Sequence, residues 1–255
     1  MPTQWTLFLS PPPPSCVLPT HLHAAACAAP LESSGEDHAA QTKPFTAALT
    51  GQRLTLGRLD ESTSPDLPAR LREPLRLGEH TAAATLIDQR FEAYTRMASA
   101  PPTPRAAISF DSPTYVNQGG CQFPLPVPEL LLAGLARRWE VFSPQPLPPS
   151  ALSEAVESAH LVRHDIRTTA AGAGSHRRTG FVGRVMFGLP TRMSRRTQRV
   201  FAALWSFAAF SGVGTRATHG LGHVRVRLDA QASIPEGPKT IPDSKPSPLL
   251  SERSF

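Results

Sequence analysis

Four glycines lie within eleven residues near the C-terminal end of this 255-residue chain: Gly212, Gly214, Gly220 and Gly222. The segment that holds them, 211–222, follows an apolar, helix-like run and precedes an alternating, strand-like run at 223–228. Glycine adopts positive φ and leaves no Cβ between backbone amides and a bound anion. A helix, a glycine-rich loop and a strand can therefore cradle a phosphate backbone, whereas a tight connection that merely needs glycine is the alternative.

The order of these elements argues against a mononucleotide site. Phosphate-binding loops of the Rossmann and Walker types run from a strand through the loop into a helix. Here the helix comes first, and the glycine loop (residues 211–222) contains no Gly-Lys-Ser/Thr sequence. The loop therefore favours a polymer backbone over a free nucleotide.

The same order of elements is predicted twice along the chain. In the first half, strands are expected at 4–10, 44–49, 53–59 and within 81–97, with helices at 20–29 and 65–72. In the second half, strands are expected at 106–110, 159–168, 180–188 and 222–228, with helices at 128–140 and 196–210. The repeated βαββαβ order predicts an α+β protein made of two tandem ferredoxin-like domains.

The expected domain limits follow from composition. An N-terminal domain at 1–98 and a C-terminal domain at 105–228 are joined by a proline-rich stretch at 99–104. From residue 229 onward the chain is rich in proline, serine and charge and poor in aromatic residues. Such a composition predicts a disordered tail over 229–255.

Positive charge is concentrated in the second half. The net charge is −2 over residues 1–100, +9 over 101–228 and −1 over 229–255, and all 15 basic residues of the middle section are arginine. Arginine grips phosphates bidentately and stacks on bases. Codon bias in a GC-rich genome explains arginine in place of lysine, but it does not explain why acidic residues are scarce there. A polyanion-binding face on the second half is the preferred interpretation.

The cysteines and the apolar runs indicate where the protein works. Cys16, Cys27 and Cys121 show no metal-ligand spacing, which favours reduced thiols. No apolar run approaches the length that spans a bilayer, and the N-terminus has no signal-peptide pattern. The sequence predicts a cytoplasmic protein with no membrane partner, no metal site and no cofactor.

Three segments, in order, carry a family resemblance. They are residues 38–46 (HAAQTKPFT), residues 108–115 (ISFDSPTY) with LPVP at 125–128 and a helix ending in RRW at 137–139, and residues 179–185 (TGFVGRV) with the glycine loop. Together they resemble the CRISPR-associated endoribonucleases of the RAMP superfamily, which cut precursor guide RNA within each repeat. The glycine loop alone is typical of the whole superfamily, whereas the ordered set is more specific.

The resemblance implies a metal-independent endoribonuclease. Its partner would be CRISPR repeat RNA, as precursor and as mature guide RNA, with other effector-complex subunits as further possible partners. Attack by the RNA's 2′-hydroxyl would leave a 2′,3′-cyclic phosphate and a 5′-hydroxyl. The matched motif makes His38 the candidate general acid or base, because a histidine pKa lies near neutrality. Lys43 is a second candidate catalytic residue, with an ordinary surface cation before Pro44 as the alternative.

A larger set of residues is expected to contact RNA. Arg137 and Arg138 lie near a predicted helix C-terminus, which also favours cations on electrostatic grounds alone. The expected RNA-binding residues are Arg137, Arg138, Arg177, Arg178, Gly212, Gly214, Arg216, His219, Gly220 and Gly222.

Two other functions compete with this hypothesis. One is a non-catalytic RAMP subunit that binds guide RNA in an effector complex, and the motif around His38 argues against it. The other is an RNA-binding module that stacks bases on aromatic strand residues. Only 7% of the residues are aromatic, and no strand carries that signature.

Overall fold

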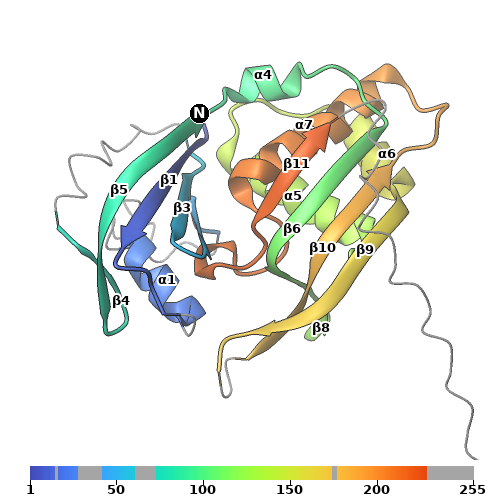
Figure 1. Cartoon of the computed structure of the whole chain (residues 1–255). Helices are drawn as coiled ribbons and strands as arrows, with labels where there is room; N and C mark the ends of the chain where they lie inside the picture. Colours follow the sequence, from blue (N-terminus) through green and yellow to red (C-terminus); the bar gives the residue numbers. More distant parts are fainter. Residues whose placement is uncertain (15–16, 28–41, 61–72, 174–176, 229–255) are drawn as a thin grey trace, which may run out of the picture.

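The computed structural model describes residues 1–14, 17–27, 42–60, 73–173 and 177–228. His38, the helix expected at 65–72 and the tail at 229–255 lie outside the described residues. The described chain forms two large antiparallel sheets with helices packed against them, and one two-stranded sheet (Figure 1).

The first sheet has the strand order β2-β3-β1-β5-β4. Its strands are β1 (Thr3–Ser10), β2 (Phe45–Thr50), β3 (Arg53–Arg58), β4 (Leu75–Leu77) and β5 (His80–Phe91). Alternate residues of β1, Trp5, Leu7 and Leu9, are buried and pack with Leu22 of helix α1 (Pro19–Ala26). The sequence placed the start of this helix at Thr20, but the helix begins at Pro19, whose fixed φ suits a first turn.

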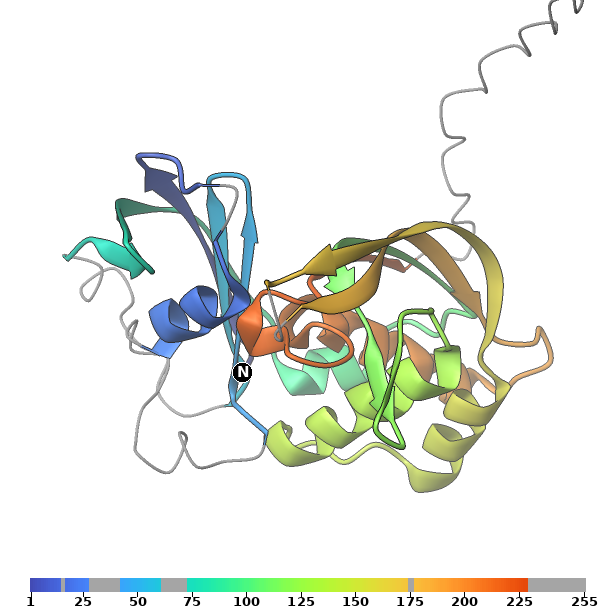
Figure 2. The same cartoon turned by 90° about the horizontal axis from the view of Figure 1, so that it is seen from below.

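The second sheet has the order β11-β6-β10-β9. Its strands are β6 (Arg105–Thr114), β9 (His160–Ala171), β10 (Arg178–Gly188) and β11 (Val224–Leu228). Helices α5 (Pro128–Phe142), α6 (Pro149–Ser158) and α7 (Arg195–Ser211) lie on one side of this sheet (Figure 2). A short hairpin, β7 (Val116–Gln118) and β8 (Cys121–Phe123), forms a separate two-stranded sheet.

Both sheets have the ferredoxin-like arrangement. In the first sheet, β1 lies between β3 and β5, and β2 lies beyond β3. In the second, β6 lies between β10 and β11, and β9 lies beyond β10. The prediction of two tandem ferredoxin-like units is therefore confirmed. Strand β4, hairpin β7–β8 and helix α6 were not predicted, because the βαββαβ pattern has no place for them.

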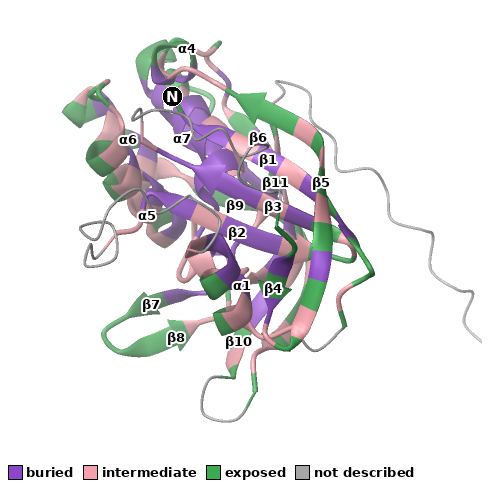
Figure 3. Ribbon diagram, turned by 90° about the vertical axis from the view of Figure 1, so that its left-hand side faces the viewer, coloured by how far each residue is buried: buried purple, intermediate pink, exposed green. Residues whose placement is uncertain are grey.

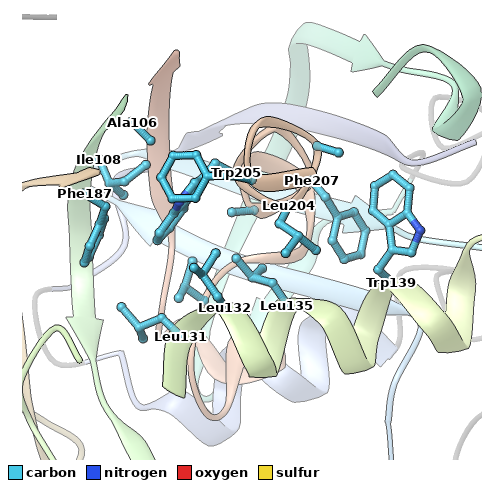
Figure 4. Packing of buried hydrophobic residues seen from close by; sticks show 14 of the residues in the cluster. Ala106, Ile108, Leu131, Leu132, Leu135, Trp139, Phe187, Leu204, Trp205 and Phe207 are labelled. Carbon is cyan, nitrogen blue, oxygen red and sulfur yellow. The ribbon is translucent and has the colours of Figure 1, made fainter. Parts of the chain in front are cut away.

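Helix α7 forms the centre of the larger core. Eleven of its 17 residues are buried, which is typical of a helix packed on several sides. Trp205 stacks on Phe187 of β10 with ring centroids 4.7 Å apart, and Phe207 meets Trp139 of α5 edge-on at 5.5 Å (Figure 4). These aromatic contacts fix α7 between the sheet and α5.

The end of α7 also joins the two units. The side chain of Gln4 on β1 donates a hydrogen bond to the carbonyl of Ala209 at 2.9 Å. The hydroxyl of Thr46 on β2 donates to the carbonyl of Phe210 at 3.1 Å. Figure 3 shows the resulting band of buried residues, which continues from the first sheet into the helices. The last turn of α7, a helix of the second unit, is thus also held by two strands of the first sheet.

Helix α4 (Tyr94–Ala98) lies between the sheets in sequence but packs with the second unit. Tyr94 and Met97 are fully buried in the core around α7. The Tyr94 hydroxyl donates a hydrogen bond to the carbonyl of Leu59, just after β3, at 2.7 Å. Residues that composition assigned to the N-terminal domain therefore complete the C-terminal core.

None of the helices within the described residues is long and apolar enough to cross a membrane.

We expect Tyr94→Phe to lower the free energy of unfolding by about 1–3 kcal/mol, because the buried Leu59 carbonyl loses its donor. Urea denaturation followed by circular dichroism measures this. Phe91→Leu, at a side chain that is 63% exposed, is the control and should change stability by less than about 0.5 kcal/mol. Equal stability of all three proteins would show that this hydrogen bond does not stabilise the junction.

Candidate functional site

A hollow of about 800 Å³ lies where the two units meet. It is lined by α1, the start of β2, the second half of α5 and the glycine loop. In Figure 2, α1 and the glycine loop with its short helix η3 (Ala217–His219) lie side by side. The lining side chains that carry charge or can transfer a proton are His23, Lys43, Arg137, Arg138, Glu140, Arg216 and His219.

The glycine loop needs its glycines for reasons internal to the protein. All four have positive φ, between 64° and 87°. A Cβ on Gly214 would lie 2.4 Å from the carbonyl oxygen of Tyr115, and one on Gly222 would lie 1.9 Å from that of Val213. The expectation of positive φ is confirmed, and close packing of loop on protein explains these two positions without a ligand.

Backbone hydrogen bonds fasten the loop to the end of β6. The amide of Thr215 donates to the carbonyl of Tyr115 at 2.9 Å, and that of Gly222 donates to Pro113 at 3.1 Å. Within the loop, the amide of Val213 donates to the carbonyl of Gly222 at 2.8 Å. The loop is therefore closed at its base, and its middle section forms the wall of the hollow.

Arg138 holds the loop from the side of α5. Its Nη1 donates to the carbonyls of Ser211 at 2.6 Å and Gly212 at 3.2 Å, and its Nη2 donates to Gly214 at 3.0 Å. Burial, with a smaller effect of neighbouring Arg137, lowers the pKa of Arg138 to about 10, so that it stays charged at neutral pH. With three carbonyls already bound, Arg138 serves to position the loop. Its predicted contact with RNA stays a prediction.

Arg216 occupies a strained position in the wall. Its φ of 64° and ψ of 38° lie in the left-handed region, and it is the one non-glycine residue with positive φ in the described part of the chain. Such a conformation costs a non-glycine residue roughly 1–2 kcal/mol and clusters at functional sites. Arg216 therefore lines the hollow in a conformation that glycine would adopt at a lower cost.

His219 lies against His23 of α1. Their rings are parallel within 5°, with centroids 4.1 Å apart. Burial, then the neighbouring His23 and Arg216, lower the pKa of His219 to about 4. With this pKa the ring is neutral at neutral pH, so it could contact RNA as a hydrogen-bonding or stacking group. The contact of His219 with RNA stays a prediction.

His23 is a pocket residue that the sequence did not indicate. His23 lies within α1, and its ring also stacks on the ring of Phe45, with the two centroids 5.7 Å apart. The pairing with His219 joins residues almost 200 positions apart, and no local pattern reports it.

The remaining predicted residues are placed as follows. Lys43 and Arg137 line the hollow, and Arg137 is exposed. Arg177 and Arg178 lie at the start of β10 and do not line it. The turns of the loop depend on the positive φ of Gly212, Gly220 and Gly222, which do not themselves line the hollow. Among the described residues, no group of three or more His, Cys, Asp or Glu side chains is arranged to hold a metal ion.

Comparisons with known proteins agree with the sequence resemblance. The family model described as CRISPR-associated endoribonuclease Cas6 matches residues 108–224. The curated CRISPR-associated endoribonuclease Cas6 of Mycobacterium tuberculosis (strain CDC 1551 / Oshkosh) is 30% identical over 131 residues. That match covers 50% of this chain and 40% of the relative, so it spans less than half of the relative's length.

Solved structures cover more of the chain. A Cas6 product complex is 26% identical with a TM-score of 0.77, and a Cas6 substrate mimic complex is 26% identical with a TM-score of 0.74. Each match covers 89% of this chain and 100% of the other. The resemblance to the repeat-cleaving CRISPR proteins of the RAMP superfamily is therefore confirmed.

We expect Arg138→Lys to lower the free energy of unfolding by about 1–3 kcal/mol, because an ammonium group cannot span three carbonyls as a guanidinium does. Urea denaturation measures the loss. Arg137→Lys, one residue away on the exposed side of α5, is the matched control and should stay within about 0.5 kcal/mol of the unchanged protein. Equal losses in the two variants would contradict the positioning role.

We expect the imidazole of His219 to titrate near pH 4 by nuclear magnetic resonance in the free protein. The folded state resists protonation that the unfolded chain accepts from its ordinary pKa of 6.5, so stability falls as the pH drops from 6.5 toward 4. His23→Ala should raise the pKa, because burial and a neighbouring charge are both reduced. An unshifted His219 titration near 6.5 in the folded protein would show that the ring is not buried in the hollow.

Proposed function

We propose that this chain, a relative of the CRISPR-associated Cas6 endoribonucleases, cleaves precursor RNA within CRISPR repeats and releases guide RNAs. The observation that carries the proposal is the hollow between the two ferredoxin-like units, whose walls present Lys43, Arg137 and Arg216. It is supported by two similar Cas6 structures, one described as a product complex and the other as a substrate mimic complex.

The chemistry requires little beyond positioning, charge and proton transfer. The 2′-oxygen of the nucleotide before the cut attacks phosphorus and loses its proton, while the bond from phosphorus to the 5′-oxygen breaks and that oxygen gains a proton. The fragments carry a 2′,3′-cyclic phosphate and a 5′-hydroxyl. Because the nucleophile belongs to the RNA, the protein needs an acid or base and cations beside the phosphate.

Cations in the hollow suit the developing charge. Lys43, Arg137 and Arg216 come from three separate segments and line one space. Preorganised positive groups stabilise the extra negative charge on a phosphorane-like transition state more than the charge of the ground state. Arg216 is held at a fixed place by the loop that Arg138 braces. The loop thus contributes a rigid cation as well as a wall.

His38 is the proposed proton-transfer residue. It lies five positions before Lys43, so the covalent chain keeps it within about 18 Å of that wall of the hollow. One similar Cas6 structure, 26% identical, is described as a histidine-to-alanine mutant, which supports a histidine in that protein's site. His219 is neutral at pH 7 because of its low pKa, so it is poorly suited to give up a proton to the leaving oxygen.

We expect His38→Ala to bind repeat RNA with nearly unchanged affinity but to cleave it about 10²- to 10⁴-fold more slowly, because general acid–base groups contribute that much. Single-turnover cleavage of labelled repeat RNA in EDTA measures the rate, and a binding assay with a 2′-deoxy substitution at the cut measures the affinity. His80→Ala, on the β4–β5 hairpin outside the hollow, is the control and should cleave at the normal rate.

Two outcomes would redirect the proposal. Normal cleavage by His38→Ala would move proton transfer to another residue. An unchanged protein that binds repeat RNA but never cuts it, or that cuts a 2′-deoxy substrate as fast as RNA, would overturn the mechanism. Binding without cutting would favour a guide-RNA-binding subunit that is not an enzyme.

A further inference from the structure

Within the described residues, the helices α5, α6 and α7 cover one side of the second sheet and leave the other side open (Figure 2). Antiparallel partners point to the same side of a sheet, so the pairing registers define which side chains share this side. One row across the four strands contains Arg225, Ser109, Arg184 and Asp165. The next outward row contains Arg227, Ala107, Met186 and Arg163. The residues between these rows, such as Ile108 and Val185, are buried against the helices.

This open face, the side of β6, β9, β10 and β11 away from α5 and α7, is rich in arginine. Its exposed arginines are Arg105, Arg163, Arg167, Arg184, Arg225 and Arg227. Two aspartates, Asp111 and Asp165, lie among them. Asp111 is held by Arg225 through two hydrogen bonds of 2.6 and 2.8 Å. Arginines therefore outnumber acidic groups on this side.

Most of this charge is not neutralised within the protein. Among the described residues, Arg163, Arg184 and Arg227 have no ion-pair partner. Met186 lies on the same side of the sheet, where it packs against Ala107 and is only 4% exposed. Uncompensated guanidinium groups on a sheet that also fixes their spacing form a surface complementary to a polyanion.

The open face lacks the features by which a sheet binds stacked bases or another protein. The aromatic residues of its four strands, Phe110, Phe181 and Phe187, are all buried on the helix side, so bases cannot stack on them. The face also lacks exposed aromatic side chains, which are enriched at the core of protein–protein interfaces. A surface of arginines without stacking platforms suits phosphates rather than bases.

We propose that the open face is a second RNA-binding surface, which holds the phosphate backbone of the RNA away from the cleaved bond and does not read its sequence. This rests on the proposed function of the hollow as the cleavage site. The hollow opens beside α5 and the glycine loop, on the helix side of the sheet. The glycine loop leads directly into β11, the edge strand that carries Arg225 and Arg227, so an RNA chain passing this edge reaches both surfaces.

The test compares two pairs of substitutions that remove equal charge. Arg184→Gln with Arg227→Gln alters the open face. Arg195→Gln with Arg199→Gln alters exposed positions on α7, in the helical layer, and is the matched control. Each protein is titrated with repeat RNA that carries long flanking sequence and a 2′-deoxy nucleotide at the cut, over a range of salt concentrations. Single-turnover cleavage at saturating RNA is measured in parallel.

The face variant is expected to show a log–log salt slope smaller by about 1.4, since each lost phosphate contact on single-stranded RNA removes about 0.7. The loss should be the same for flanks of different sequence and absent when the flanks are removed. Cleavage at saturating RNA should be unchanged. The control pair should keep the original slope.

Other results overturn the proposal. Equal loss in both pairs would show a general effect of net charge, and a loss that depends on flank sequence would show base recognition. If the face variant binds the RNA with unchanged affinity, the open face does not bind RNA, and an acidic protein would be the better candidate partner. Because binding is measured on an RNA that is not cut, a protein without nuclease activity would refute the proposed function while still testing the open face.

Discussion

The candidate site depends on the hydrogen bonds that the guanidinium group of Arg138 donates to the glycine loop. One cation binds three backbone carbonyls at the end of α7 and the start of the glycine loop. Carbonyls at a helix C-terminus have no partner within the helix and carry partial negative charge, which a cation offsets. The contact fixes α5, α7 and the loop relative to one another, and thereby fixes the wall that contains Arg216 and His219.

The hollow exists because α7 belongs to both units. Its apolar sides complete the core of the second ferredoxin-like unit, while its last carbonyls accept hydrogen bonds from Gln4 and Thr46 of the first. Lys43, His23 and the glycine loop therefore line one hollow that neither unit could form alone. The cations that the proposed chemistry needs come from both sides of this junction.

Periodicity predicted most elements but not how they meet. The helix expected at 196–210 spans Arg195–Ser211, and the four glycines have the positive φ expected of them. Helix α6 and strand β4 were missed because the repeated βαββαβ pattern accounts for neither. The role of Arg138 and the stacking of His23 on His219 were also missed, since both join residues more than 70 positions apart. His38 was assigned through a motif shared with a family, and no physical pattern in the sequence alone would have selected it.

The central claim is that the cleaved phosphate lies in the hollow between the two units. Photocrosslinking tests it most directly, with a photoreactive nucleotide beside the cut of an uncleavable repeat RNA and mass spectrometry of the crosslinked peptides. The account predicts crosslinks to residues 42–46, 134–141 and 211–219, which line the hollow from separate segments. Crosslinks confined to other surfaces, such as the β4–β5 hairpin or α6, would contradict it.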